Sequence, residues 1–197
     1  MLLRTFLNLL PLVAAATAVS SEGGYLVPKD LAPGFYHVNF HANGTSTVEK
    51  LDPTAVVPRD TNAAEKRDLR ISGSAKFARA LAKRFAYGDS GRFMIEQDQY
   101  NTLTARWRSY FSLGNAASPG ITFYITDRLV LASCNYGRNN QFMPPESVDE
   151  FNGVLDQNFG LWHTGWVHWG DVYGDITFWR DYRGIRLCSN LNGGWVP

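Results

Sequence analysis

The chain has 197 residues, of which 45% are hydrophobic and 19% are charged, a composition typical of one globular domain with or without an appendage. Its 19 Lys and Arg residues nearly balance 18 Asp and Glu residues, so the net charge is +1 and no broad basic surface is available for nucleic acid. Nucleic acid is therefore not an expected partner. No apolar stretch in the interior of the chain is long enough to predict a membrane-spanning helix.

The first residues have the pattern of a secretory signal peptide. Arg4 precedes a mainly apolar stretch from Phe6, and the small residues Ala16 and Ala18 stand at the two positions that signal peptidase recognises. A membrane anchor is the alternative, but the apolar stretch is about half of what a bilayer requires. We therefore predict a signal peptide over residues 1–18, with cleavage after Ala18 or alternatively after Ala16, and a secreted, extracellular protein.

The two cysteines, Cys134 and Cys188, are predicted to form a disulfide, because secretion provides an oxidising environment and the number of cysteines is even. The closed loop of about 55 residues corresponds to about 4 kcal/mol of stabilisation in the chain-entropy description. Two buried free thiols are the alternative. Neither cysteine has the CxxC spacing or the ligand cluster of a metal site, and no metal or cofactor is predicted.

A change in composition predicts a division of the chain near residue 67. All six tryptophans and both cysteines lie beyond residue 100. The polar, aperiodic segment 57–67 ends in Lys66-Arg67, which predicts an exposed linker that a kexin-type protease would cut after Arg67. We expect a pro-segment over residues 19–67 and a mature domain over residues 68–197.

A second dibasic pair, Lys83-Arg84, allows further trimming, so that the mature chain would begin at residue 85. The preceding residues 68–84 carry five basic side chains and one acidic side chain. Residues 74–86 have the apolar spacing of a short helix. A basic amphipathic helix can contact a membrane surface, whereas an arm that covers the domain, or additional pro-segment, are the alternative interpretations.

The pro-segment is predicted to contain a β-hairpin. Tyr36, Val38 and Phe40 alternate with polar and aromatic residues and would form one apolar face, and residues 42–44 offer the turn. Since a lone hairpin is marginal in water, this face is expected to pack on the C-terminal domain until cleavage, as a folding aid or an inhibitory cover. Asn43 begins an N-glycosylation sequon in the turn.

The residues of this hairpin carry a resemblance. The stretch from Gly34 to Thr45, preceded by residues 29–33 and followed by the triplet Glu65-Lys66-Arg67, resembles the pro-segments of ascomycete fungal secreted preproproteins. In such proteins a short strand, an Asn-Gly turn and a Lys-Arg site precede a small disulfide-linked effector or toxin domain. The resemblance implies a fungal source and a pro-segment that is removed.

The C-terminal domain is predicted to be rich in strands. An interposed helix over residues 147–159 is indicated by apolar residues at helical spacing, with Ser147 and Glu150 as a possible capping box and Gly160 as its C-terminal cap. The strands are expected at residues 92–96, 103–111, 121–126, 129–134, 165–169, 175–180 and 184–188. The predicted class is α+β, a small antiparallel sheet of about four to six strands or a partly closed barrel, with one packed helix and a single disulfide.

Residues with catalytic chemistry suggest a small secreted hydrolase, such as a ribonuclease, as one interpretation. That reaction requires a general base, a general acid and a cation that holds phosphate charge. The residues of the required types are His163, His168, Glu96, Arg180, Arg183 and Arg186. His163 and His168 are five residues apart and cannot share a strand face, and the arginines are equally well explained as solvated charges. The sequence therefore favours a protein without enzymatic activity.

Aromatic residues near the C-terminus suggest a binding surface. Five tryptophans lie in the last 36 residues, and exposed aromatic side chains bind sugar faces or protein partners, although most such residues belong to the core in a small domain. The candidate binding residues are Trp166, His168, Trp169 and Arg180. This part of the chain also resembles fungal necrosis-inducing and killer-toxin-like secreted domains, but those usually have more disulfides, and no functional residue is carried over.

Together these patterns predict a secreted fungal effector or toxin-like protein that binds a protein of a host or competitor cell. The alternatives are a small secreted hydrolase and a module that binds cell-wall glycan. The protein is expected to be a monomer.

Overall fold

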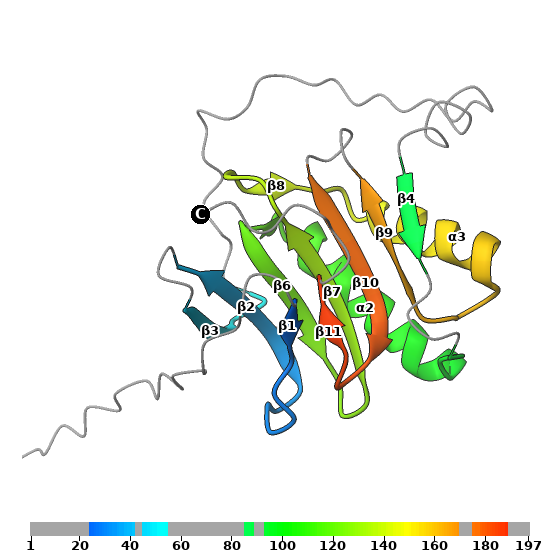
Figure 1. The fold of residues 1–197 in the computed structure, drawn as a ribbon. Coiled ribbons are helices and arrows are strands. Elements are labelled where there is room, and N and C mark those ends of the chain that lie inside the picture. The colour runs from blue at the N-terminus through cyan, green and yellow to red at the C-terminus, as the bar shows by residue number, and fades with distance from the viewer. Residues whose placement is uncertain (1–23, 42–44, 55–84, 89–92, 170–174, 189–197) are drawn as a thin grey trace, which may run out of the picture.

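Seven antiparallel strands form the main sheet of the computed structural model, in the order β3-β2-β6-β7-β10-β9-β4 (Figure 1). The structure describes residues 24–41, 45–54, 85–88, 93–169 and 175–188. The strands of the main sheet are β2 (Gly34–Phe40), β3 (Ser46–Leu51), β4 (Phe85–Gly88), β6 (Gly120–Ile125), β7 (Leu129–Asn135), β9 (Gly165–Trp169) and β10 (Ile176–Tyr182). The other elements are α2 (Gln97–Ser112), α3 (Ser147–Phe159), the pair β1 (Tyr25–Leu26) and β11 (Arg186–Leu187), and the pair β5 (Ala116–Ala117) and β8 (Gln141–Phe142).

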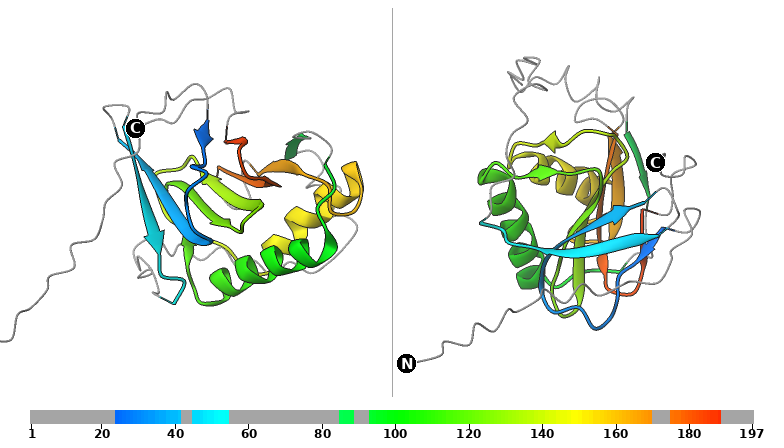
Figure 2. Two further views of the ribbon diagram at one scale, coloured as in Figure 1. Left: turned by 90° about the horizontal axis from the view of Figure 1, so that it is seen from below. Right: turned by 90° about the vertical axis from the view of Figure 1, so that its left-hand side faces the viewer.

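The elements are arranged in three layers (Figure 2). Helices α2 and α3 cover one face of the main sheet, here called the helix face, and their apolar side chains pack on alternate residues of the strands. The β1–β11 pair lies on the opposite face, here called the outer face, above a second core cluster. The predicted α+β fold with an antiparallel sheet is therefore confirmed. The sheet is open, however, and two helices pack on it where one was expected.

The prediction of a strand over residues 103–111 is wrong, because this segment lies in α2. Its aromatic residues favour a strand by propensity, but Leu103, Trp107, Tyr110 and Phe111 have the spacing of one helical face, and all four are buried. The indole nitrogen of Trp107 also donates a hydrogen bond to the carbonyl oxygen of Leu131 in β7. Packing on the sheet thus decided the secondary structure of this segment.

The other predicted elements of this region are present with small changes. Helix 147–159 has the predicted bounds, and Gly160 follows it with a φ of 101°, which a glycine adopts without strain. The capping box is absent, because Ser147 is already inside the helix and donates its hydroxyl hydrogen to the carbonyl oxygen of Pro144. Residues 92–96 were expected to form a strand, but in the described part Met94 makes only an isolated bridge to His163.

The predicted hairpin consists of β2 and β3, which are two strands of the main sheet. Strand β2 pairs with β3 on one side and with β6 on the other, so it is not an edge strand. Tyr36 and Val38 are buried on the outer face, as predicted. The opposite face of the strand is buried as well, because Phe35 stacks on Tyr110 with ring centroids 4.7 Å apart. The hairpin therefore contributes to both cores.

Several predictions concern residues outside the described part of the chain. Cleavage of the signal peptide, processing at the dibasic sites and glycosylation stay predictions for this reason. The residues concerned are Ala18, Lys66, Arg67, Lys83, Arg84 and Asn43. The predicted helix at residues 74–86 does not extend to its expected end, because Phe85 and Ala86 belong to strand β4. Within the described residues, no helix has the length and apolar character needed to cross a membrane.

Candidate functional site

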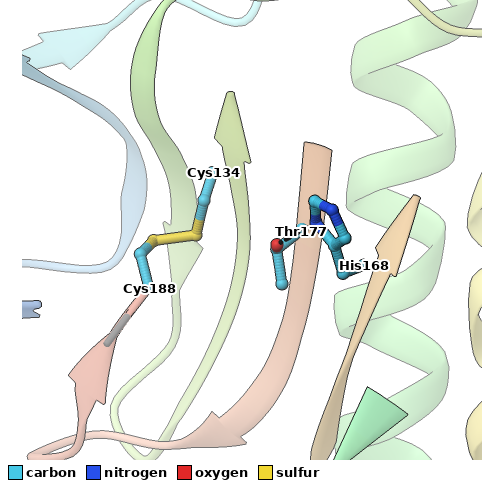
Figure 3. The surroundings of a disulfide bond; sticks show 4 residues. All are labelled: Cys134, His168, Thr177 and Cys188. Carbon is cyan, nitrogen blue, oxygen red and sulfur yellow. Dashed lines mark hydrogen bonds between the residues drawn. A yellow bond between two sulfur atoms is a disulfide. The ribbon is translucent and has the colours of Figure 1, made fainter. Parts of the chain in front are cut away.

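The predicted disulfide between Cys134 and Cys188 is present, and it joins two layers of the molecule (Figure 3). Cys134 lies in β7 with its side chain on the outer face, and Cys188 directly follows β11. Their Cα atoms are 6.0 Å apart, and both residues are buried. The bridge therefore holds the covering β1–β11 pair against the main sheet.

Beside the disulfide on the outer face, His168 and its neighbours form a small polar cluster. Thr177 pairs with Cys134 on one side and with His168 on the other, so the three residues form one row across β7, β10 and β9 (Figure 3). Nδ1 of His168 is 2.9 Å from Oγ1 of Thr177, and its Nε2 is 3.4 Å from a carboxylate oxygen of Asp175. Burial raises the pKa of the Tyr136 phenol, whose ring is edge-on to His168.

This cluster has the residue types of a nucleophile with a base, but not the accessibility. Thr177 would be the nucleophile, and its side chain is buried beneath the surface of the sheet. A nucleophilic hydroxyl must reach a substrate atom at close distance. The geometry therefore fits a hydrogen-bonded support for the sheet better than an acyl-transfer site.

The four candidate binding residues are divided between the two faces. Trp166 and His168 lie on the outer face and are half-buried, and Trp166 stacks on Trp179 with ring centroids 6.1 Å apart. Trp169 and Arg180 are buried on the helix face. The structure thus brings Trp166 and His168 together at the surface and places the other two residues in the core.

Arg180 is fully buried in a network that fastens α3 to the sheet. Its Nη1 and Nη2 donate hydrogen bonds to Asn152 and Asp156 of α3, each at 2.8 Å, and its Nε donates to the carbonyl oxygen of His163, also at 2.8 Å. The ring of Tyr100 from α2 lies 5.1 Å from the guanidinium carbon. All of these contacts are internal, so the charge of Arg180 is used for packing.

Of the residues considered for ribonuclease chemistry, Arg180 meets His163 through the backbone carbonyl oxygen of His163, whereas the others lie elsewhere in the described part of the chain. Arg180 pairs in register with Gly165, so it lies on the face opposite to His168. Arg183 donates hydrogen bonds to backbone carbonyl oxygens of the N-terminal segment, and Arg186 donates to Gly24. Glu96 forms an exposed ion pair with Arg128. The described residues therefore contain these chemical groups at separate positions.

The described part of the chain also has a surface depression. A depression of about 300 Å³ lies between the start of α2 and the β6–β7 turn, and it is open to solvent. Its lining residues are Asp98, Gln99, Thr102, Thr126, Asp127 and Arg128. Because most of these side chains are polar and exposed, this is a surface depression and not an enclosed reaction site. Within the described residues, no group of His, Cys, Asp and Glu side chains has an arrangement that could hold a metal ion.

The strongest surface feature is a set of exposed apolar side chains that the sequence did not predict. Phe93, Met94 and Leu161 are exposed by 59%, 63% and 63% of their possible area, and we call them the apolar patch. Backbone hydrogen bonds join the two segments that carry the patch. The amide of Ile95 donates to the carbonyl oxygen of Trp162, and the amide of Thr164 donates to the carbonyl oxygen of Phe93. Phe93 and Met94 were expected to be in a strand, where alternate residues face the core, and this expectation concealed their exposure.

Tyr182 of β10 supports the patch from the sheet. Its hydroxyl donates a hydrogen bond to the carbonyl oxygen of Met94, and its ring packs edge-on against Phe93 with centroids 6.2 Å apart. The exposed side chains are therefore carried by a backbone that is fixed to β10 and to the loop after α3. A preformed surface loses little conformational entropy on binding.

His37 is buried on the helix face, and its surroundings lead us to expect that the stability of the protein depends on pH. Nδ1 of His37 is 3.0 Å from Oγ1 of Thr122, and its Nε2 is 3.0 Å from Oδ1 of Asn39. Burial lowers the pKa of His37 below 6.5, although hydrogen bonds and the charge of Glu49 act in the opposite direction. The unfolded chain therefore binds a proton at a higher pH than the folded protein does, and the free energy of unfolding is expected to fall as the pH drops below about 6.5.

The contribution of His37 is isolated by comparing two variants. Urea unfolding of His37→Gln at about pH 7.5 and about pH 5 should give a smaller loss of stability at acidic pH than the wild type shows. His41→Gln is the matched control, because His41 is exposed just beyond the end of the same strand. Equal pH dependence in the wild type and His37→Gln would contradict this assignment.

Comparison of the chain with protein-family models, with curated proteins and with solved structures gives no match in any of the three cases. The functional argument therefore depends on the residues and the geometry described above.

Proposed function

We propose that this protein is a secreted fungal effector or toxin-like protein that acts by binding a protein of a host or competitor cell, without catalysing a reaction. The observation that carries the proposal is the apolar patch, because large apolar side chains exposed on two adjacent, hydrogen-bonded segments offer a surface for a partner. The signal-peptide pattern, the resemblance to ascomycete preproproteins and the disulfide are consistent with a protein that works outside the cell.

The alternatives have less support from the geometry. A hydrolase would need an accessible nucleophile or an assembled acid and base, whereas Thr177 is buried and Arg180 lies on the other face from His168. A glycan-binding module would need exposed aromatic faces, whereas Trp169 and Trp179 are buried and Trp166 is half-buried against Trp179. Binding of a protein through the apolar patch uses side chains that are already exposed.

Replacing all three patch residues with serine is expected to abolish binding while leaving the fold intact. A few large apolar side chains commonly carry most of the binding energy of an interface, so we expect a loss of affinity of about 100-fold or more. Binding of the labelled protein to a panel of plant and fungal cells, together with the dose that produces a cell response, measures this effect. The melting temperature should change little, because the patch side chains are exposed.

The matched control is the double variant Leu26→Ser and Leu113→Ser, which removes two exposed leucines from other parts of the surface. It should bind and act like the wild type. Full binding by the triple patch variant would rule out the patch as the contact surface. Hydrolysis of a substrate that is lost in His168→Ala would instead favour the enzyme.

A further inference from the structure

The two predicted dibasic cleavage sites both lie between β3 and β4 in the chain. Strand β3 ends at Leu51, the described part continues to residue 54, and β4 begins at Phe85. A cut after Arg67 or Arg84 would therefore divide the chain into two pieces that are no longer covalently connected. We call them the N-terminal piece, which contains β1 to β3, and the C-terminal piece, which contains β4 to β11.

The N-terminal piece is part of the sheet and of both cores. In β2, residues 34–38 pair with residues 121–125 of β6, and β1 pairs with β11 (Figure 1). Tyr25, Val27, Phe35, Tyr36 and Val38 are all buried. Such a contact resembles the interior of a domain more than a surface on which a cover rests.

The C-terminal piece would lose essential cover if the N-terminal piece left. Phe123 of β6 contacts Tyr36 and Tyr25, with ring centroids 5.5 Å and 6.0 Å apart. Departure of β2 would expose this ring and would also turn β6 into an unpaired edge strand, which favours aggregation. Retention of the N-terminal piece avoids both consequences.

Hydrogen bonds also join the two pieces. Nη2 of Arg183 donates hydrogen bonds to the carbonyl oxygens of Pro28, Lys29 and Leu31, at distances from 2.9 to 3.0 Å. The side-chain amide of Asn115 donates to the carbonyl oxygen of Pro53. These partners lie on either side of the hairpin in the chain, so the N-terminal piece is held both before and after the hairpin.

We propose that the processed protein is a two-chain molecule in which the N-terminal piece remains bound in the main sheet after cleavage. The proposal uses the predicted cleavage at a dibasic site but replaces the expected removal of residues 19–67 by their retention. The association is non-covalent, because both Cys134 and Cys188 belong to the C-terminal piece. The pieces therefore separate on a denaturing gel without reductant, but remain together in native conditions.

The first experiment examines the product secreted by a kexin-competent fungal host. Its mass in denaturing solvent should show two chains, and native mass spectrometry should show one complex with the sum of their masses. A C-terminal piece alone in the native measurement would overturn the proposal at the binding step. A single chain from residue 19 to residue 197 would overturn it at the processing step.

A second experiment tests association without depending on the host. A recognition sequence for a site-specific protease replaces Lys66-Arg67, and the folded protein is cut and applied to a sizing column at about 1 µM, a concentration at which the two pieces of a core-like interface should elute together. Separate elution of the pieces would contradict retention. Neither experiment depends on the apolar patch. The outcomes are therefore independent of whether the patch binds the proposed partner.

Adjacent residues of the N-terminal piece provide a matched pair of variants. Val27 is 1% exposed and Leu26 is 46% exposed, so Val27→Asp should increase the dissociation constant of the cut protein at least about 100-fold, whereas Leu26→Asp should change it less than about 3-fold. Each variant is first checked for a cooperative unfolding transition before cleavage. Equal effects of the two substitutions would show that the described interface does not hold the pieces together.

Discussion

Replacement of Arg180 with alanine is expected to lower the free energy of unfolding by about 3–5 kcal/mol, the usual cost of breaking a buried ion pair. The guanidinium of Arg180 is fully buried, and its three donor nitrogens bind Asn152, Asp156 and the carbonyl oxygen of His163. Removal of the side chain leaves these acceptors without their donor in the interior. Urea unfolding should show a lower midpoint with little change in the dependence on urea concentration.

The size of this effect depends on how many elements the arginine connects. Asp156 also accepts a hydrogen bond from the amide of Trp162, so loss of Arg180 disturbs both α3 and the loop that follows it. Arg180→Lys should recover only part of the stability, because an ammonium group cannot reproduce the planar arrangement of donors. A lysine variant as stable as the wild type would show that charge alone is sufficient.

The matched control for Arg180 is a surface ion pair with a shorter contact. Arg108 of α2 and Asp149 of α3 are 2.6 Å apart, but about half of each side chain is exposed. Solvent and salt weaken such a pair, so Arg108→Ala should cost less than about 1 kcal/mol. Equal losses in the two variants would contradict the claim that burial gives Arg180 its importance.

The sequence alone did not show that Arg180 is a buried residue that connects α3 to the sheet. Its partners in α3 precede it by 24 and 28 residues, and only the packing of α3 on β10 brings them to the guanidinium. The neighbouring residues in the sequence are equally consistent with a solvated turn. Interactions between elements of this kind are absent from any local pattern.

The elements that the sequence predicted well have strong local signals. The β6–β7 hairpin follows from two runs of β-branched and aromatic residues, and α3 follows from apolar spacing that ends at a glycine. The disulfide was predicted from the expected secretion of the protein and the even number of cysteines. In α2, by contrast, the strand propensity of the aromatic residues conflicted with the helical spacing of Leu103, Trp107 and Phe111. The segment forms a helix, in agreement with the spacing.

The candidate site was less predictable than the fold because exposure is a property of packing. Trp166 and Trp169 are both in β9, but alternation in the strand puts Trp166, which is half-buried, on the outer face and Trp169 in the core of the helix face. Phe93 and Leu161 are brought into the same region only because the segment before α2 lies beside the loop after α3. The sequence separation of the two segments hides this arrangement.

Removal of the disulfide is expected to cost about 4 kcal/mol, a large part of the stability of a small domain. The bridge links residues separated by 54 positions, so it restricts the unfolded chain considerably. The double variant Cys134→Ala and Cys188→Ala removes it without leaving a polar group in the buried site of Cys134. Chemical unfolding of this variant and of the wild type measures the difference.

Local opening should accompany the loss of the bridge. Leu187 pairs with Tyr25, so Cys188 holds β11 and, through it, the start of the N-terminal segment against the sheet. Hydrogen exchange should therefore accelerate in β1 and β11 more than in β6 and β7. Reductant should destabilise the wild type but leave the double variant unchanged, because only the wild type has a bond to reduce. An equal midpoint for the two proteins under oxidising conditions would contradict the expected stabilisation and would show that packing alone holds the outer layer.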